Sequence, residues 1–460
     1  MCGGGAGIPE GQTPAAPSSL PSSTSSDFPW HLGVADAHCH PTDTMASIAS
    51  IPSMKARVLT VMATRSQDQD LVASVASKHA VGSRAALQAG PAPNAADRVV
   101  PAFGWHPWFS YQLYDDGDDD DAAEKSGLTT EELKAKLYGA VLSPAPSDEF
   151  VAGLPDPVPL GRFLADTRRR VLDAGVAMIG EVGLDKTFRL PWPWGMAQGS
   201  QGSAGEEERR QGGQQASSEL TPGGREGRML SPHQVRMPHQ VRVLEAQLRL
   251  AGELGVPVSV HGVQAHGVLF DVLAGLWKGY EKEVVSRRKQ KLVAPGAEDF
   301  SSSDDDDYDD DDDEEGHDDG FQVSDGEGEL GRPKDRPRIA AVAGRRHKSK
   351  PFPPRICLHS FSGSPQTLKQ YVHPAVPAKV FFSFSSTINL STAGGAGRFG
   401  DVLRACPDDR VLVESDLHCA GDAMDGALED ITRRVCEGKG WPLEEGVVRL
   451  RNNYVEFLFG

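Results

Sequence analysis

Short runs of apolar residues recur along the chain, and segments of helical period separate them. The runs are continuous rather than alternating and rich in Val and Ile, which is typical of strands buried on both faces of a sheet. We expect eight such strands, at Gly33–Cys39, Arg57–Ala63, Arg98–Gly104, Val176–Gly180, Val256–Val260, Arg355–Leu358, Lys379–Phe384 and Arg410–Val413.

Amphipathic segments lie between these runs. In His239–Leu254, the apolar residues Val241, Leu244 and Leu248 follow one another at steps of three or four, which is the spacing of one helix face. Further helices are expected at Ser66–His79, Leu160–Ala174, Ser364–Val372, Gly400–Ala405 and within Asp425–Phe459. Strands that alternate with helices in this way predict an α/β fold, namely a (β/α)8 TIM barrel.

Low-complexity stretches interrupt this pattern. They fall at about 114–157, 195–232 and 282–354, and the segment 1–32 is similarly rich in Gly, Ser, Pro and Thr. Such compositions bury too little apolar surface to fold, so we expect a disordered tail at 1–32 and disordered insertions within one barrel domain at 33–460.

The charge of the chain is concentrated in two of these stretches. The net charge is −18, but Asp304–Asp319 holds 13 acidic residues and Asp115–Asp121 holds 6, so the remainder carries about +1 (−18 + 19). The acidic balance therefore says little about the substrate of the folded part. The long acidic run is typical of a solvated segment or a docking site for a basic partner. Basic clusters at 287–291 and 345–350 flank it, and they predict nuclear-import signals, nucleic-acid contacts or charge pairs with the acidic run.

Several classes of protein are excluded by the sequence. The chain has no stretch of 18 apolar residues, so we expect no transmembrane helix. Its N-terminus lacks the basic and apolar regions of a secretory signal. The six cysteines are scattered and form no CxxC pair, which favours a reducing compartment, the cytoplasm or the nucleus. We also expect a monomer.

Ionisable residues gather where the predicted strands end. The first strand runs into Asp36-Ala-His38-Cys-His40, and residues two apart in a strand point to the same face. Other strands end at Glu181 and Asp185, at His261, at His359, and at Glu414-Ser415-Asp416. Taken singly, each suits a surface pair, a strand-end salt bridge or a core histidine. A barrel brings these ends to one mouth, however, where four histidines and two carboxylates predict a site for one or two Zn²⁺, Mn²⁺ or Mg²⁺ ions.

The ordered motifs DAHCH, FGWHP, IGEVGLD, VPVSVH, LHSFSGS and VESD resemble those of the TatD family of metal-dependent deoxyribonucleases, within the amidohydrolase-like barrels. The resemblance extends from about Gly33 to Phe459. The acidic insertions are similar to those of the fungal branch of the family. Some members of that branch are described as binding partners of a cell-cycle ubiquitin-ligase subunit.

This resemblance implies a role for each motif residue. His38 and His40 resemble ligands of a first ion, His261 and His359 ligands of a second, and Glu181 a carboxylate that bridges both. Asp416 resembles a ligand of the first ion that also orients or deprotonates the attacking water. His106 matches a position that lines the substrate pocket, with Trp105 as a stacking surface, although packing of the third strand would explain both residues equally well.

Two departures from the family pattern concern the substrate. Family members carry Ser-Arg-Asp after the fifth-strand histidine, where this chain has Gly262-Val263-Gln264, so Val263 replaces an arginine that could face a phosphate. Leu417-His418 stands where a turn containing proline is usual. Cys39 points away from the predicted ligands, which indicates barrel packing.

The leading functional hypothesis is a hydrolase that uses two divalent ions to cleave DNA, as a 3′–5′ exonuclease. The alternative is a barrel with weak or no nuclease activity that binds a protein partner through the acidic insertion in cell-cycle regulation. Hydrolysis of an amide or another ester also stays open, because ligand identity alone does not define the substrate.

Overall fold

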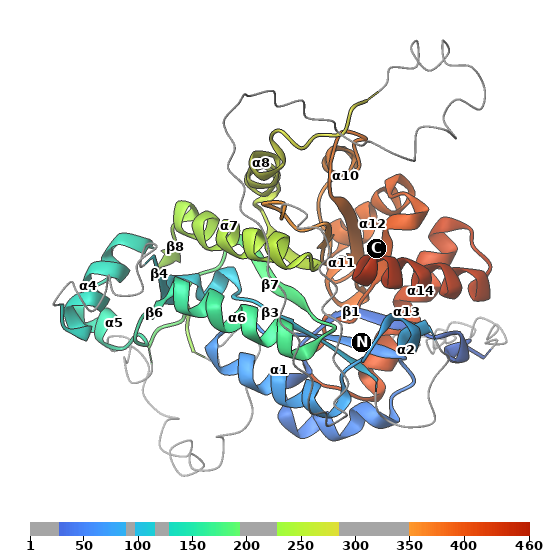
Figure 1. The fold of residues 1–460 in the computed structure, drawn as a ribbon, viewed down its shortest axis with the longest axis horizontal. Coiled ribbons are helices and arrows are strands. Elements are labelled where there is room, and N and C mark those ends of the chain that lie inside the picture. Colours follow the sequence, from blue (N-terminus) through green and yellow to red (C-terminus); the bar gives the residue numbers. More distant parts are fainter. Residues whose placement is uncertain (1–26, 89–96, 116–127, 194–227, 285–348) are drawn as a thin grey trace, which may run out of the picture.

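The computed structural model describes residues 27–88, 97–115, 128–193, 228–284 and 349–460 (Figure 1). The (β/α)8 architecture predicted from the sequence is confirmed. Its eight parallel strands are β1 (Ala35–Cys39), β2 (Val58–Met62), β3 (Val99–Phe103), β7 (Met178–Asp185), β9 (Val258–Val263), β10 (Arg355–Leu358), β11 (Lys379–Phe384) and β12 (Val411–Val413).

The strands follow one another around the barrel in chain order, and each pairs in parallel with the next. Hydrogen bonds between β1 and the residues that follow β12 bring the first and last strands together. The Asp416 N–H donates to the His38 carbonyl at 3.0 Å, and the Ser415 N–H donates to Asp36 Oδ1 at 3.0 Å. The barrel is therefore nearly closed, and the ends of both strands lie at the same mouth.

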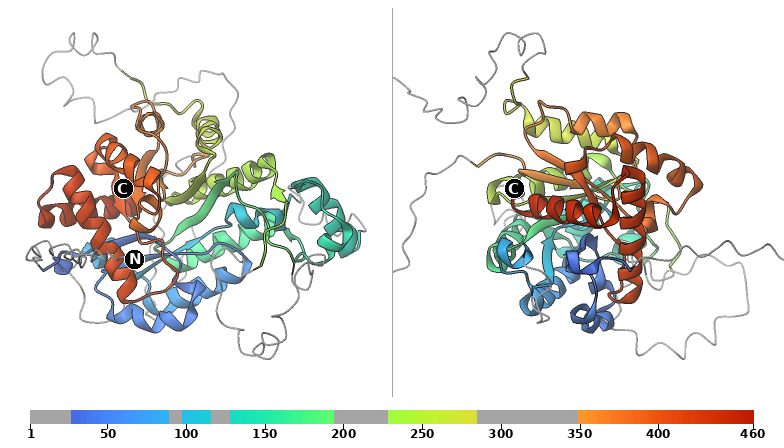
Figure 2. Two further views of the ribbon diagram at one scale, coloured as in Figure 1. Left: turned by 180° about the vertical axis from the view of Figure 1, so that it is seen from behind. Right: turned by 90° about the vertical axis from the view of Figure 1, so that its right-hand side faces the viewer.

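Helices surround the barrel, with α1, α6 and α7 on one side and α12 to α14 on the other (Figures 1 and 2). The helices are α1 (Ser66–His79), α2 (Arg84–Gln88), α4 (Thr130–Val141), α5 (Asp148–Ala152), α6 (Leu160–Ala174), α7 (Met237–Leu254), α8 (His266–Trp277), α10 (Pro365–Tyr371), α11 (Ser386–Asn389), α12 (Ala393–Ala405), α13 (Asp422–Lys439) and α14 (Leu443–Phe459). Between β1 and β2 the described chain forms only 3-10 turns, at Pro41–Asp43 and Met45–Ser53.

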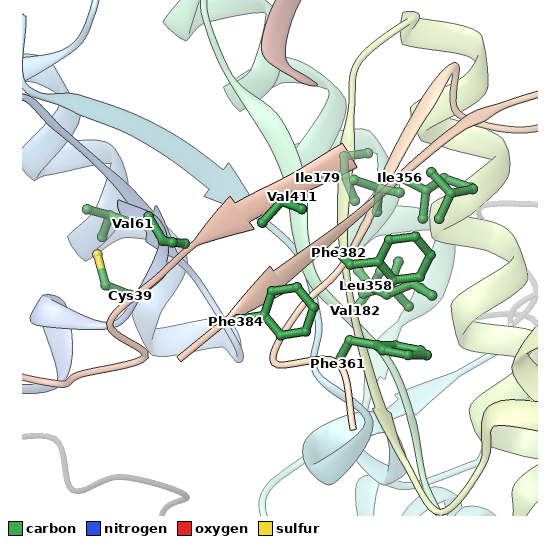
Figure 3. Close-up of a cluster of buried hydrophobic side chains, with 14 of the residues drawn as sticks. Cys39, Val61, Ile179, Val182, Ile356, Leu358, Phe361, Phe382, Phe384 and Val411 are labelled. Carbon is green, nitrogen blue, oxygen red and sulfur yellow. The ribbon is translucent and has the colours of Figure 1, made fainter. Parts of the chain in front are cut away.

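The core lies between the strands and these helices. On α7, the buried residues Leu244, Leu248 and Ala251 lie at the expected helical spacing, and Gly255 ends the helix in a left-handed conformation (φ 67°). Figure 3 shows Phe382, Leu358 and Val182, from three strands of the barrel, packed in this layer. The barrel thus gives the mouth a rigid frame.

The prediction of a disordered insertion over about 114–157 is wrong for residues 128–157. Thr129 begins α4 with a capping box, in which the Thr129 and Glu132 side chains each accept from the other's backbone N–H. The α4–α5 segment then buries Tyr138 and Phe150 in a small core of its own, together with Phe188. Short strands attach it to the barrel: β4 (Leu113–Tyr114) pairs with β6 (Val158–Pro159), and β5 (Leu142–Ser143) pairs with β8 (Gln234–Val235).

Most of the other predicted low-complexity segments lie outside the described residues. This applies to the predicted tail up to residue 26, and to 194–227 and 285–348, which include the long acidic run, the first basic cluster and the second basic cluster as far as residue 348. The flanks of the last segment are folded, since Phe352 is buried and Lys282 N–H donates to the Ala375 carbonyl at 3.0 Å. Within the described ranges, no helix has the length and apolar character needed to span a bilayer.

Candidate metal centre

A cavity of about 370 Å³ opens at the mouth where the barrel strands end. Glu181 projects into it from β7, His261 from β9 and His359 from the residue after β10. His40 and Asp416 follow β1 and β12, and His38 lies behind them, fully buried. The structure therefore brings all six predicted ligand residues together. Next to them, Asp36 and Ser415 are hydrogen-bonded although 379 positions of sequence separate them.

One oxygen of Glu181 faces the residues that we call the first set, His38, His40 and Asp416. Glu181 Oε2 lies 3.4 Å from the Nε2 atoms of both His38 and His40. Asp416 Oδ1 lies 3.5 Å from His40 Nε2 and 3.8 Å from His38 Nε2. The donor atoms of this set thus surround one point.

The other oxygen of Glu181 faces the second set, His261 and His359. Glu181 Oε1 lies 2.9 Å from His261 Nδ1 and 2.9 Å from His359 Nε2. The two sets adjoin, because the rings of His38 and His359 stack with their centroids 3.9 Å apart. A single carboxylate therefore stands between two groups of histidines.

Polar groups behind three of the histidines orient their rings. The nitrogen that faces away from Glu181 lies 2.8 Å from Ser259 Oγ in His38 and 3.4 Å from Asp185 Oδ2 in His261. In His359 this nitrogen, Nδ1, lies 3.6 Å from Glu414 Oε1, so the contact is electrostatic rather than a hydrogen bond. Each rear partner favours a proton on the outer nitrogen and leaves the inner nitrogen free to bind a cation.

The electrostatics of the cluster keep its carboxylates ionised. Burial alone would raise the pKa of Glu181, but the nearby histidines, His106 first among them, hold that pKa well below its usual range. Burial also opposes ionisation of Asp416, whose hydrogen bond with His40 and nearby histidine charges nevertheless lower its pKa to about 2. Both side chains therefore offer anionic oxygens.

The histidines differ in their protonation. Burial disfavours the charged form of His40, but contacts with Asp416 and Glu181 outweigh it and raise the pKa of His40 to about 9. The same competition raises the pKa of His359, mainly through Glu181, and that of His261, through Asp185 and Glu181. In His38, burial and the neighbouring His359 lower the pKa. In the absence of an ion, protons on these rings balance the carboxylates.

His106 has a different role from the other four histidines. Its Nδ1 accepts a hydrogen bond from the Trp108 N–H at 3.2 Å, which leaves the proton of the neutral ring on Nε2. Burial, the largest influence, lowers the pKa of His106 to about 4, so the ring is neutral. Its Nε2–H lies 3.1 Å from Glu181 Oε1. In the absence of an ion His106 is therefore a neutral hydrogen-bond donor to Glu181, and it also lies with Glu181 and His261 in a group of donors that could hold a cation.

The two sets fit divalent ions. His38 and His40 direct their Nε2 atoms at each other across 3.1 Å, and His261 Nδ1 faces His359 Nε2 across 3.2 Å. In neutral rings these would be opposed lone pairs, which a shared proton or cation relieves. A mixed nitrogen and carboxylate donor set suits Zn²⁺ and Mn²⁺, and its carboxylates suit Mg²⁺. Donor atoms of the described residues lie within 4.8 Å of one another in three groups: His38–His40–Glu181, His38–His359–Asp416 and His106–Glu181–His261.

Trp105 does not reach this cavity, which corrects its prediction as a stacking surface. Its indole is buried, donates to the Phe109 carbonyl at 2.8 Å and packs edge-on against Phe163. Trp108 lines the cavity instead, stacked on Phe188 with ring centroids 4.6 Å apart. β3 ends at Phe103. Trp105, two residues later, packs among the surrounding helices, whereas Trp108, in the 3-10 turn that follows, lines the cavity. Cys39 is buried in the core, as expected.

Several residues at the site were not assigned a role from the sequence. Ser259 stands two residues before the ligand His261 within β9, so the alternation of the strand already puts it on the same face. Asp185 shares the face of Glu181 for the same reason. Glu414 follows the end of β12, where strand alternation no longer applies. Arg65, Asp43 and His418 belong to loops at the mouth, where no periodicity places a side chain. Asp43 Oδ2 accepts from His418 Nδ1 at 2.8 Å, and the His418 ring stacks on His40.

Comparisons with known proteins show the family of this chain. A family model described as TatD related DNase matches residues 35–459. The Cut9-interacting protein scn1 of Schizosaccharomyces pombe is 32% identical over 425 residues, which cover 92% of this chain and 98% of that protein. An uncharacterized deoxyribonuclease of Saccharomyces cerevisiae is 25% identical over 323 residues, or 69% of this chain and 66% of the relative.

Solved structures were also matched across most of the chain. A TatD homologue from Escherichia coli has 15% identity and a TM-score of 0.42, and the match covers 93% of this chain and 98% of the homologue. An uncharacterized amidohydrolase from Saccharomyces cerevisiae has 13% identity and a TM-score of 0.43, with 94% and 96% covered.

Proposed function

The chain belongs to the TatD-related DNase family of metal-dependent hydrolases, and from this premise we propose that it cleaves the phosphodiester bonds of DNA as a 3′–5′ exonuclease that uses two divalent ions. The observation that carries this proposal is the position of Glu181, whose two oxygens face two separate groups of histidines. A shared carboxylate between two nitrogen-rich groups is the arrangement that a pair of ions requires.

In this proposal His38, His40 and Asp416 hold the first ion, His261 and His359 hold the second, and Glu181 contacts both. Two bound divalent ions supply an activated water and neutralise charge on the phosphate oxygens. The Asp416 carboxylate is ionised, since its pKa is about 2, and it lies at the cavity surface, so it accepts the proton of the attacking water. The His106 Nε2–H, which faces Glu181 Oε1 at 3.1 Å, orients that carboxylate.

The walls of the cavity favour a small substrate unit. Trp108, Phe109, Val263 and Ile388 give it apolar sides, which limit the access of water and suit a base or a sugar. Its volume of about 370 Å³ is that of a small-ligand site rather than a groove for a duplex. This size supports the removal of one terminal nucleotide at a time.

The test is cleavage of a single-stranded oligonucleotide labelled at its 5′ end, with Mg²⁺ or Mn²⁺. The wild type should give a ladder of shortened labelled products, and Asp416→Asn should lower the rate about 10²- to 10⁴-fold, as expected for loss of a general base. Asparagine suits the left-handed backbone of residue 416 (φ 53°), so the fold should be kept. The exposed Asp401→Asn serves as the control. A wild type that holds metal and cleaves no phosphodiester would refute the proposal.

A second candidate function is binding of a protein partner. It is supported by the name of the 32% identical relative, a Cut9-interacting protein, and by the acidic run Asp304–Asp319. Because Phe352 and Lys282 belong to the folded part, a deletion should be confined to residues 285–348. Loss of a partner from pull-downs, with unchanged thermal stability, would support this candidate. Retention of the same partner by the deletion variant would count against it.

A further inference from the structure

Arg65 is the one arginine or lysine among the described residues that line the cavity. It follows β2 and directly precedes α1, on the same side of the mouth as His40. The opposite wall, next to the ligand His261, carries Gly262 and Val263 and no cation. An anionic substrate that enters the cavity therefore meets a single guanidinium.

The guanidinium of Arg65 is held in place by its neighbours, but they do not occupy its N–H groups with close hydrogen bonds. Its Nε lies 3.4 Å from Asp68 Oδ1, and its Nη2 lies 3.8 Å from Asp43 Oδ1. Both distances exceed the ~2.7–2.9 Å of a charge-assisted hydrogen bond. The plane of the guanidinium is supported by Phe109, whose ring centroid lies 5.1 Å from Cζ.

The two carboxylates beside Arg65 have other donors. Asp68 Oδ2 accepts from the Thr64 N–H at 3.1 Å and from the Thr64 hydroxyl. Asp43 Oδ2 accepts from His418 Nδ1 at 2.8 Å. They fix the position of the guanidinium electrostatically and leave its N–H groups available to a ligand. A buried, pre-positioned arginine fork matches the geometry of phosphate oxygens.

On these grounds we propose that Arg65 binds the phosphate of the substrate and thereby determines the preference of the cavity for phosphate-bearing anions. This inference rests on the proposed function for the identity of the anion. It assigns the cationic contact to the β2 side of the mouth, at a residue between β2 and α1.

The direct test measures binding of inorganic phosphate to the metal-loaded protein by calorimetry. Arg65→Gln should weaken binding about tenfold or more, because a charge-assisted fork is lost. Arg65→Lys keeps the charge and the ion pairs but not the fork, so it should bind at an intermediate strength. The matched control is Arg398→Gln, in the neighbouring hollow formed by α11 and α12, which should leave binding unchanged.

Two further variants separate binding from support of the fold. Adding Val263→Arg to Arg65→Gln places a cation on the opposite wall and should restore part of the phosphate affinity. Asp43→Asn keeps the cation but removes one of the two carboxylates that fix the guanidinium, so it should weaken phosphate binding less than Arg65→Gln does. If Arg65→Gln leaves phosphate affinity unchanged while its metal content and melting temperature match the wild type, the inference is wrong. Metal content and melting temperature are measured for every variant.

A small phosphodiester, bis(p-nitrophenyl) phosphate, distinguishes this inference from the proposed function. If the wild type cleaves it and Arg65→Gln raises KM with kcat much less affected, both stand. If the wild type cleaves it and Arg65→Gln leaves KM unchanged, the inference fails while the function stands. If the wild type cleaves neither this compound nor the labelled oligonucleotide but binds phosphate through Arg65, the proposed function fails and the inference stands.

Discussion

Replacing Asp185 by asparagine is expected to weaken ion binding by the second set alone. Asp185 Oδ1 accepts from the Thr187 N–H at 2.7 Å, the Thr187 hydroxyl at 2.8 Å and the Phe188 N–H at 3.0 Å. Its Oδ2 accepts from Trp108 Nε1 at 2.6 Å and faces His261 Nε2 at 3.4 Å. The single oxygen of asparagine would take the place of Oδ1 and keep its three donors. The NH₂ group would take the place of Oδ2, where it would face the N–H groups of Trp108 and His261.

The size of the effect follows from this geometry. His261 loses the acceptor that holds its proton on Nε2 and turns Nδ1 toward Glu181. Loss of such an outer partner lowers metal affinity about 10- to 100-fold, or about 1.4–2.7 kcal/mol. The first set does not contact Asp185, so its affinity should stay within about twofold of the wild type.

A mirror variant provides the control. Ser259→Ala removes the hydroxyl that lies 2.8 Å from His38 Nδ1, so it should weaken ion binding by the first set and spare the second. Both variants, together with the wild type, would be stripped of metal and titrated with Mn²⁺ in a calorimeter. The reasoning is refuted if Asp185→Asn and Ser259→Ala weaken the same class of site, or if neither changes any affinity while metal still binds.

The remaining predictions concern pH and one glycine. Without metal, the pKa of His40 is about 9, above its ordinary 6.5, so its ion pairs stabilise the fold fully below pH 6.5 and this stabilisation is lost as the pH rises through 9. The Asp416 contribution is present above 3.8 and is lost only as the pH falls through about 2. The melting temperature of the metal-free protein should therefore fall between pH 6.5 and 9 while ion affinity rises, and thermal scans in EDTA that stay flat over this range would contradict the assignment. In Gly183→Ala, the new Cβ would lie 2.1 Å from the His261 carbonyl oxygen at a backbone φ of 150°, so second-set ion binding should fall at least about tenfold. Gly139→Ala, in a helix with open space around it, should bind ions normally and melt slightly higher.

The barrel strands could be predicted from the sequence because they are buried on both faces. A continuous run such as Lys379–Phe384 has few alternatives in a chain of this composition, and the observed strand has the same bounds. The meeting of the histidines was also predictable, since parallel strands in a barrel end at one mouth. Alternation along each strand would have added Asp185 and Ser259, had it been applied to both sides of every motif residue, whereas Glu414 lies beyond β12.

Other features depend on contacts that a linear pattern does not contain. The α4–α5 segment follows an acidic stretch, and its composition does not indicate a core. In the structure, however, Tyr138 and Phe150 pack against residues from distant parts of the chain. Trp105 and Trp108 differ by only three positions, and the 3-10 turn that begins at Pro107 decides which of them reaches the cavity. Arg65 belongs to a loop and is positioned by Asp43 and Phe109.

The first set of ligands joins the first strand of the barrel to the last. During synthesis, His38 and His40 leave the ribosome long before Asp416, and the Asp36–Ser415 hydrogen bonds cannot form until β12 has docked beside β1. An ion held by all three residues would stabilise only the complete, closed barrel, since the incomplete chain lacks Asp416. At a free ion concentration of about 100 times Kd, this binding would stabilise the closed barrel by about 2.7 kcal/mol. The supply of metal ions would thus influence the fraction of synthesised chains that reach the closed barrel, apart from any role of the ions in catalysis.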